Sequence, residues 1–150
     1  MIGNLALAAF MVGLTVVIHF SGLLLLMWWL RARGHRFRAH ESAVGQGAVI
    51  VLVVLGLVAT LTLEIWLYAV VYRMLGALPD FEAALYFSTT SFTTIGYGDV
   101  VLDKGWRLLA AIEGANGLLL FGWSTAFLIS IVNRMRALEH DWLERPGPSP

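Results

Sequence analysis

The sequence contains no cysteine and few charged residues. None of its 150 residues is Cys, and only 13% are Asp, Glu, Lys or Arg. The lack of cysteine excludes disulfides and thiolate metal sites. A soluble domain carries about 25% charged residues, so the scarcity of charge argues against a soluble globular protein. The formal net charge is zero, so an informative charge pattern must lie in the distribution along the chain, and no nucleic-acid partner is expected.

Three long apolar runs occupy most of the chain. They cover residues 2–30, about 43–72 with Glu64 inside, and about 106–132 with Glu113 inside. A helix rises about 1.5 Å per residue and the hydrocarbon core of a bilayer is about 30 Å thick, so each run predicts a transmembrane helix. The first run lacks the basic start and the short apolar core of a signal peptide, which favours a membrane helix there too.

The basic residues predict the orientation of these helices. Seven of the ten lie in the link after the first run or beyond the third run: Arg31, Arg33, Arg36, Arg38, Arg134, Arg136 and Arg145. The positive-inside rule places that side in the cytoplasm. We therefore expect a multi-pass protein of a plasma or bacterial inner membrane, with its N-terminus outside and its C-terminus cytoplasmic. The four arginines from 31 to 38 are also candidates for binding anionic lipid headgroups.

The link of residues 73–107, which is expected outside, contains a short helix and a glycine-rich segment. Leu78-Pro79-Asp80 predicts a helix start with Asp80 as N-cap, and the helix expected over 81–92 is too short to span a membrane. The following residues, 94–99, read Thr-Ile-Gly-Tyr-Gly-Asp. Non-helical backbone at membrane depth is tolerated only where protein buries it or where it lines water. Such a re-entrant segment is expected at a pore axis.

The segment Thr-Ile-Gly-Tyr-Gly-Asp at 94–99 is similar to the filter signature of tetrameric potassium channels, Thr-Val-Gly-Tyr-Gly-Asp. The resemblance covers about residues 44–136 and does not extend to the first helix. Together with the three apolar runs, it implies an all-α membrane protein with three transmembrane helices, a re-entrant pore helix and an extended filter, assembled as a homotetramer. The chain then divides into an extra helix and basic loop (1–42), a potassium channel pore domain (43–136) and a short cytoplasmic tail (137–150).

The resemblance also implies roles for the filter residues. Four copies of the segment supply stacked rings of carbonyl oxygens that replace the hydration shell of K⁺. The segment consists of Thr94, Ile95, Gly96, Tyr97 and Gly98. Its two glycines can adopt left-handed dihedral angles. Tyr97 is expected to brace the filter against the pore helix. K⁺ is the permeant ion, and neither a cofactor nor catalysis is expected.

Four polar residues are expected to support the filter: Asp99, Thr90, Glu64 and Glu113. Asp99 is expected behind the outer mouth. Thr90 stands where family members can carry an acid that pairs with the residue matching Asp99, and threonine cannot form that ion pair. The two glutamates lie in apolar helices, where an unpaired charge is destabilising. We expect them to bond pore-helix hydroxyls such as Thr89, Thr90 and Ser91, with a direct ion or proton site as the alternative. His19 is expected to be a buried, satisfied histidine.

The third apolar run is the expected inner helix of the pore. Alignment from the Trp-Arg pair at 106–107 places Gly117 near the hinge glycine of the family. A stripe at i+4 spacing is expected to line the cavity and gate: Phe121, Thr125, Ile129 and Asn133. A second stripe, Gly122, Ala126 and Ser130, is offset by one residue and has the small side chains of close helix packing. The sequence leaves both assignments open.

The predicted function is therefore passive, K⁺-selective conduction. A non-conducting or regulatory subunit and a weakly selective cation channel are the alternatives. A membrane-embedded enzyme or proton-coupled carrier using His19, Glu64 or Glu113 is a further alternative. It is disfavoured because the sequence shows no cysteine, no His-Glu pair at metal-binding spacing and no serine motif with a base.

Overall fold

A computed structural model describes residues 2–33 and 43–143. They form four helices: α1 (Ile2–Arg33), α2 (Ala43–Met74), α3 (Phe81–Phe92) and α4 (Arg107–Leu143). Three of them are long and apolar enough to cross a membrane, over Ile2–Ala32, Val44–Met74 and Arg107–Met135. The described residues contain no strand, so the all-helical fold with three spans is confirmed. Arg36, Arg38 and Arg145 lie outside the described residues, as does the end of the expected tail.

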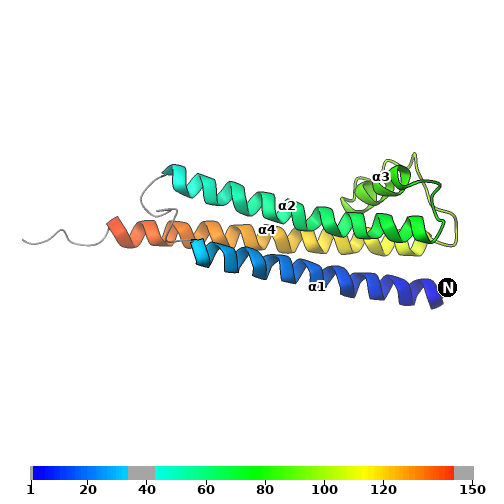
Figure 1. The fold of residues 1–150 in the computed structure, drawn as a ribbon, viewed down its shortest axis with the longest axis horizontal. Helices are drawn as coiled ribbons and strands as arrows, with labels where there is room; N and C mark the ends of the chain where they lie inside the picture. Colours follow the sequence, from blue (N-terminus) through cyan, green and yellow to red (C-terminus); the bar gives the residue numbers. More distant parts are fainter. Residues whose placement is uncertain (1, 34–42, 144–150) are drawn as a thin grey trace, which may run out of the picture.

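The three long helices lie side by side, and α3 sits against one end of the bundle (Figure 1). The start of α1, the end of α2 and the start of α4 are at the same end as α3. By the charge distribution, this is the end expected outside the membrane. The short helix therefore packs against both α2 and α4 at one end of the bundle.

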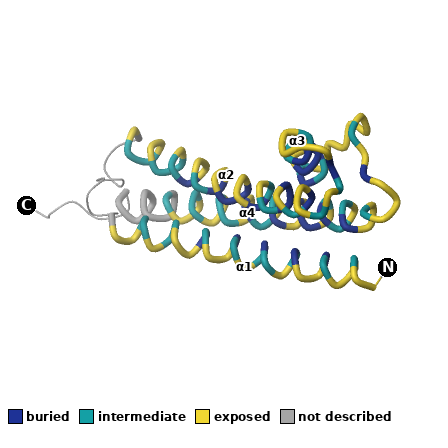
Figure 2. The backbone as a smooth tube through the Cα atoms, turned by 45° about the vertical axis from the view of Figure 1, so that its right-hand side comes forward, coloured by how far each residue is buried: buried dark blue, intermediate teal, exposed yellow. Residues whose placement is uncertain are grey.

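The surface of the long helices is apolar, as expected for contact with lipid. Exposed side chains include Phe10 and Trp28 on α1 and Val58 and Leu63 on α2. Buried residues gather on the sides of the helices that face one another, mostly in the half of the bundle near α3 (Figure 2). A soluble protein does not expose apolar surface on this scale, so the surface fits a membrane-spanning bundle.

Helices α1 and α2 approach each other closely at two glycines. A Cβ at Gly22 of α1 would lie 2.7 Å from Oγ1 of Thr60 on α2. A Cβ at Gly56 of α2 would lie 2.4 Å from Cδ2 of Leu26 on α1. Small residues let membrane helices approach closely and gain dispersion contacts. The extra helix α1 is thus packed tightly against α2.

Helix α3 begins where its sequence predicts. The Asp80 side chain accepts a hydrogen bond from the Ala83 backbone N–H at 2.8 Å, as an N-cap does. The helix ends at Phe92, and the Thr93 N–H still bonds the Thr89 carbonyl at 3.1 Å. Its carbonyl end points into the bundle, and the glycine-rich segment starts from there.

Candidate ion-conduction site

The segment after α3 has an alternating backbone. The φ angle is positive at Thr94 (61°), Gly96 (53°) and Gly98 (79°), which are every second residue. The prediction of left-handed conformations at the two glycines is therefore confirmed. Thr94 shares this conformation, which is uncommon for a β-branched residue and costs about 1–3 kcal/mol. Nothing in the sequence pointed to Thr94 as a strained position.

Backbone hydrogen bonds fix this segment to the end of α3. The Gly96 N–H donates to the Thr90 carbonyl, and the Thr94 N–H donates to the Ser91 carbonyl, both at 3.0 Å. Thr90 thus supports the segment through its main chain, while its buried hydroxyl bonds the Phe87 carbonyl at 3.0 Å. The carbonyl end of a helix carries partial negative charge, which favours a cation beside it.

A side-chain hydrogen bond ties the outer end of the segment to α3. The Tyr86 hydroxyl donates to Asp99 Oδ2 at 2.7 Å, and the Val100 N–H donates to Asp99 Oδ1 at 3.0 Å. Tyr86 therefore provides the pore-helix partner that Thr90 cannot provide. This hydrogen bond lowers the pKa of Asp99 below its ordinary value of 3.8 and raises the pKa of Tyr86 above its ordinary value of 10.0.

These pKa directions predict where the Tyr86–Asp99 bond is intact. A lowered carboxyl pKa makes its contribution complete above about pH 3.8 and lost as the pH falls through the lowered pKa. A raised phenol pKa makes its contribution complete below about pH 10 and lost above it. We expect currents to be insensitive to external pH between about 3.8 and about 10. Currents should decline when the external pH falls through the lowered pKa of Asp99.

The variant Tyr86→Phe tests this bond. Without the hydroxyl, the pKa of Asp99 returns toward its ordinary value, so the acid-induced decline of current begins at a higher external pH. Current recorded during stepwise external acidification measures the shift. The same substitution in an Asp99→Asn background should shift nothing, because the titrating carboxyl is gone. An equal shift in both backgrounds would show that the hydroxyl acts elsewhere.

Tyr97 does not brace the segment within its own chain. Its side chain is 73% exposed, and Ile95 beside it is 55% exposed. The expected packing of Tyr97 on its own pore helix is thus not made, because a single chain places no neighbour there. Among the described residues, the hydrogen bonds that hold the segment all come from α3 or from the segment itself.

A column of buried polar side chains runs behind this segment between the helices. We call it the buried polar column; its members are Thr15, His19, Glu64, Tyr68, Tyr72, Ser88, Glu113, Asn116 and Ser124. Those from α1 are four residues apart, and so are those from α2, so they share one face of each helix. That spacing was a signal in the sequence which our reading missed.

The first level of the column supports the pore helix. Glu113 accepts hydrogen bonds from the Ser88 and Tyr72 hydroxyls, each at 2.6 Å. The Ser88 hydroxyl also lies 2.9 Å from the Ile65 carbonyl. Glu113 thus bonds a pore-helix hydroxyl as expected, although that residue is Ser88 and not one of positions 89–91. The bond links α4, α2 and α3 at a fully buried point.

The second level joins α1 to the inner helix. The Asn116 amide donates to the Thr15 hydroxyl at 2.7 Å and lies 3.3 Å from the Tyr68 hydroxyl. All three side chains are buried. Helix α1, which the family resemblance did not cover, is therefore bonded directly to α4.

The third level corrects the expectation for Glu64. Its Oε1 lies 3.0 Å from His19 Nδ1, and both side chains are fully buried. Its Oε2 has no hydrogen-bond partner within the described residues. Glu64 therefore supports α1 and not the filter, because its position on α2 is two turns below Tyr72. His19 is buried and satisfied, as expected, since its Nε2 also lies 3.3 Å from the Ser124 hydroxyl.

Ser124, His19 and Glu64 together resemble a serine–histidine–acid arrangement. The sequence search missed it because the three residues lie far apart along the chain. All three side chains are buried between α1, α2 and α4, so no substrate reaches the hydroxyl. The described residues also contain no group of three His, Cys, Asp or Glu side chains that could hold a metal. The arrangement therefore holds helices together and offers no support for an enzyme.

The inner helix contacts the pore helix at Gly117. A Cβ there would lie 2.0 Å from the Phe92 carbonyl oxygen, so this residue permits the approach of α4 to the end of α3. Below it, Phe121 is half-buried and its ring lies 6.1 Å from the Phe92 ring. The rest of the expected lining stripe is exposed, and so is the small-residue stripe beside it: Thr125, Ile129, Asn133, Gly122, Ala126 and Ser130. Both stripes lie free of the other helices, so the two assignments stay open.

Comparison with known proteins identifies this part of the chain. Residues 60–134 match the family model described as ion channel, which covers half of the chain. The chain belongs to the ion channel family. The matched region of the channel includes residues 60–74 of α2, the whole of α3, the 94–99 segment and α4 to residue 134. No curated protein and no solved structure matches the chain. Helix α1 of the channel lies outside the matched region.

Proposed function

We propose that this channel conducts K⁺ selectively and passively through a filter made of residues 94–98 from four chains. The observation that carries the proposal is the positive φ at Thr94, Gly96 and Gly98. Alternation of backbone handedness directs successive carbonyls to one side. Four such backbones around an axis form rings of oxygens that replace the water around a K⁺ ion. No chemical step and no cofactor is needed.

A homotetramer follows from this proposal, because one chain supplies one quarter of each ring. The exposure of Ile95 and Tyr97 supports it, since apolar and aromatic side chains beside a pore need neighbours to cover them. In a lone chain within the bilayer, the polar backbone of the segment would face lipid. Neighbouring copies would cover these side chains and enclose the ion path.

The topology we propose follows the charge distribution. The N-terminus, α3 and the filter face outside, and the arginines after α1 and at the end of α4 face the cytoplasm. The described start of α1 and α3 lie at the same end of the bundle, so both face the same side of the membrane in this topology (Figure 1). K⁺ then enters the filter from outside and the cavity beside α4 from inside.

Flux from the purified protein in liposomes tests the proposal. K⁺-loaded vesicles should lose K⁺ in a Ba²⁺-sensitive way, while Na⁺-loaded vesicles should not lose Na⁺. Gly96→Ala should abolish K⁺ flux, because a side chain resists the φ of 53° there. Gly105→Ala in the same link is the matched control, since its added Cβ has open space.

The outcomes separate the alternatives. Equal K⁺ and Na⁺ flux would indicate a weakly selective cation channel. A lack of flux from well-folded protein in several lipids and at several pH values would favour a subunit that needs a partner. Normal K⁺ flux in Gly96→Ala would contradict the assignment of the filter itself.

A further inference from the structure

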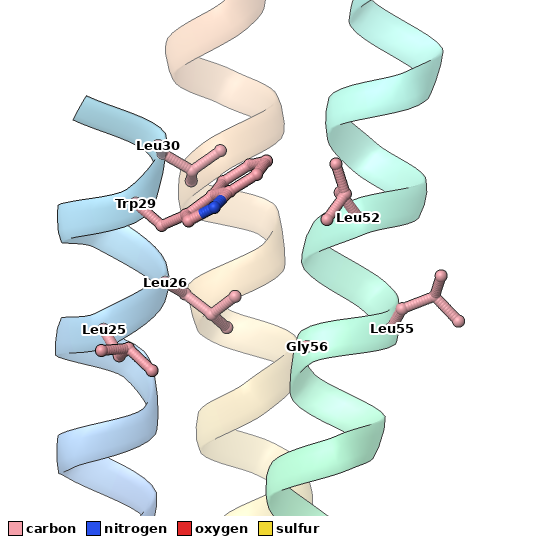
Figure 3. A pocket seen from close by; sticks show the side chains of 7 residues that line it. All are labelled: Leu25, Leu26, Trp29, Leu30, Leu52, Leu55 and Gly56. Atoms are coloured by element: carbon pink, nitrogen blue, oxygen red, sulfur yellow. The ribbon is translucent and has the colours of Figure 1, made fainter. Parts of the chain in front are cut away.

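An apolar groove lies between α1 and α2 (Figure 3). Its lining residues come from the later part of α1 and the earlier part of α2, which lie away from α3 (Figure 1). Its volume is about 340 Å³, and every lining residue is apolar: Leu25, Leu26, Trp29, Leu30, Leu52, Leu55 and Gly56. Trp29 and Leu30 extend from α1 toward Leu52 of α2, and α4 passes behind. The Leu26–Gly56 contact narrows the groove toward the middle of the bundle.

The groove opens at the surface of the bundle. Trp123 and Phe127 of α4 pack against the buried cluster of Leu23, Val53 and Leu57 that joins α1 and α2 in this half of the bundle. The groove is on the other side of α1 and α2 from α4 (Figure 3). At its rim, Leu25 is 67% exposed and Leu55 is 61% exposed. An occupant therefore enters from the lipid.

Positive charge follows the groove directly in the sequence. Arg31 comes immediately after Leu30, and its side chain is exposed. Three further arginines stand between it and α2, with Glu41 as the one acid in that link. Basic residues beside a membrane attract anionic lipids, and tryptophan is typical of the interface. Hydrocarbon surface ending in positive charge is complementary to an anionic amphiphile.

We propose that this groove binds an acyl chain of an anionic phospholipid, whose headgroup is held by Arg31. The groove is too small for a helix, which is about 10 Å across with its side chains. A neutral phospholipid would place the same chain in the groove without the attraction of Arg31. The proposal concerns the groove between α1 and α2. It does not depend on which ion the channel conducts.

Native mass spectrometry of the full-length protein, titrated with phosphatidylglycerol or phosphatidylcholine, tests the site. We expect tighter binding of phosphatidylglycerol, and about a fivefold loss of its binding in Arg31→Gln, the factor for one basic residue near an anionic surface. Leu52→Trp should fill the groove and remove the tight binding of phosphatidylglycerol. Val51→Trp is the matched control, because this neighbouring residue is 58% exposed and does not line the groove.

Leu55→Trp is a second variant that should fill the groove, and it keeps the test possible if Leu52→Trp does not fold. Loss of tightly bound phosphatidylglycerol in a filling variant that keeps the wild-type thermal midpoint supports the proposal. Equal binding of the two lipids by the wild type would overturn the anionic specificity. Unchanged lipid binding in both filling variants would overturn the groove as the site. Loss of the oligomer with lipid binding retained would show that the groove is instead a contact between copies of the chain.

Discussion

Gly117→Ala is expected to abolish conduction and to lower the stability of the bundle. The added Cβ would lie 2.0 Å from the Phe92 carbonyl oxygen and 2.8 Å from the carbonyl carbon. These are backbone atoms at the end of α3, so a side-chain rotation cannot relieve the clash. Overpacking of this kind costs about 1–3 kcal/mol. Either α4 or the end of α3 must move. The Gly96 N–H is hydrogen-bonded to the Thr90 carbonyl in the last turn of α3, so a shift of this turn would displace the proposed filter.

The matched control for this variant is Gly122→Ala on the same helix. A Cβ at Gly122 meets nothing within 4 Å in the single chain, and alanine is a better helix former than glycine. Liposome flux and the thermal midpoint should therefore fall for the substitution at 117 and fall much less at 122. If Gly117→Ala conducted normally, the close packing of α4 on the end of α3 would be wrong. If Gly122→Ala alone lost conduction, the small-residue stripe would be a contact between subunits.

His19→Leu is expected to destabilise the protein by about 1–3 kcal/mol, the range for leaving a buried hydrogen-bonding group without its partner. Glu64 would be left fully buried, with Oε1 as well as Oε2 lacking a partner within the described residues. The loss should be visible as a lower free energy of unfolding in a denaturing-detergent titration. It should also loosen α1, because His19 bonds both α2 and α4.

The double variant His19→Leu/Glu64→Leu separates the pair from general packing. Replacement of both partners by apolar side chains is often neutral or stabilising, so the double variant should recover most of the lost stability. Ser124→Ala should cost only about 1 kcal/mol, as for a single neutral hydrogen bond. Glu64→Leu alone completes the cycle. If the double variant lost as much stability as the sum of His19→Leu and Glu64→Leu, His19 and Glu64 would not interact.

The sequence predicted the helices well because their signals are local. Three long apolar runs and the N-cap at Asp80 depend on neighbouring residues, and the structure places them as expected. The left-handed glycines of the filter are equally local, since few other residues tolerate that conformation.

The partners of the buried polar residues could not be predicted in the same way. The sequence predicts that Glu64 supports the filter, whereas its partner His19 comes from a helix outside the family resemblance. Ser88 was overlooked in favour of the hydroxyls at 89–91, because the rotation of α3 about its axis is set by packing and not by its own sequence. Tyr97 is exposed in the single chain, and in the proposed tetramer its neighbours would come from other copies, which no single-chain pattern specifies.

Helix α1 is an integral part of this channel's core. It is bonded to α2 through His19 and Glu64, and to α4 through Thr15 and Asn116. The same α4 packs on the end of the pore helix at Gly117. A change in the position of α1 therefore reaches the helix that packs on the end of α3, without any intervening loop.

The reversal potential of single channels in a planar bilayer, with K⁺ on one side and Na⁺ on the other, tests the central claim most directly. The account predicts current carried by K⁺ alone, with a reversal potential displaced far toward the K⁺ equilibrium potential. It also predicts that this current disappears in Gly96→Ala and persists in Gly105→Ala. A reversal potential near zero in the wild type would contradict the account, because a filter of alternating backbone carbonyls at 94–98 would then not select K⁺ over Na⁺.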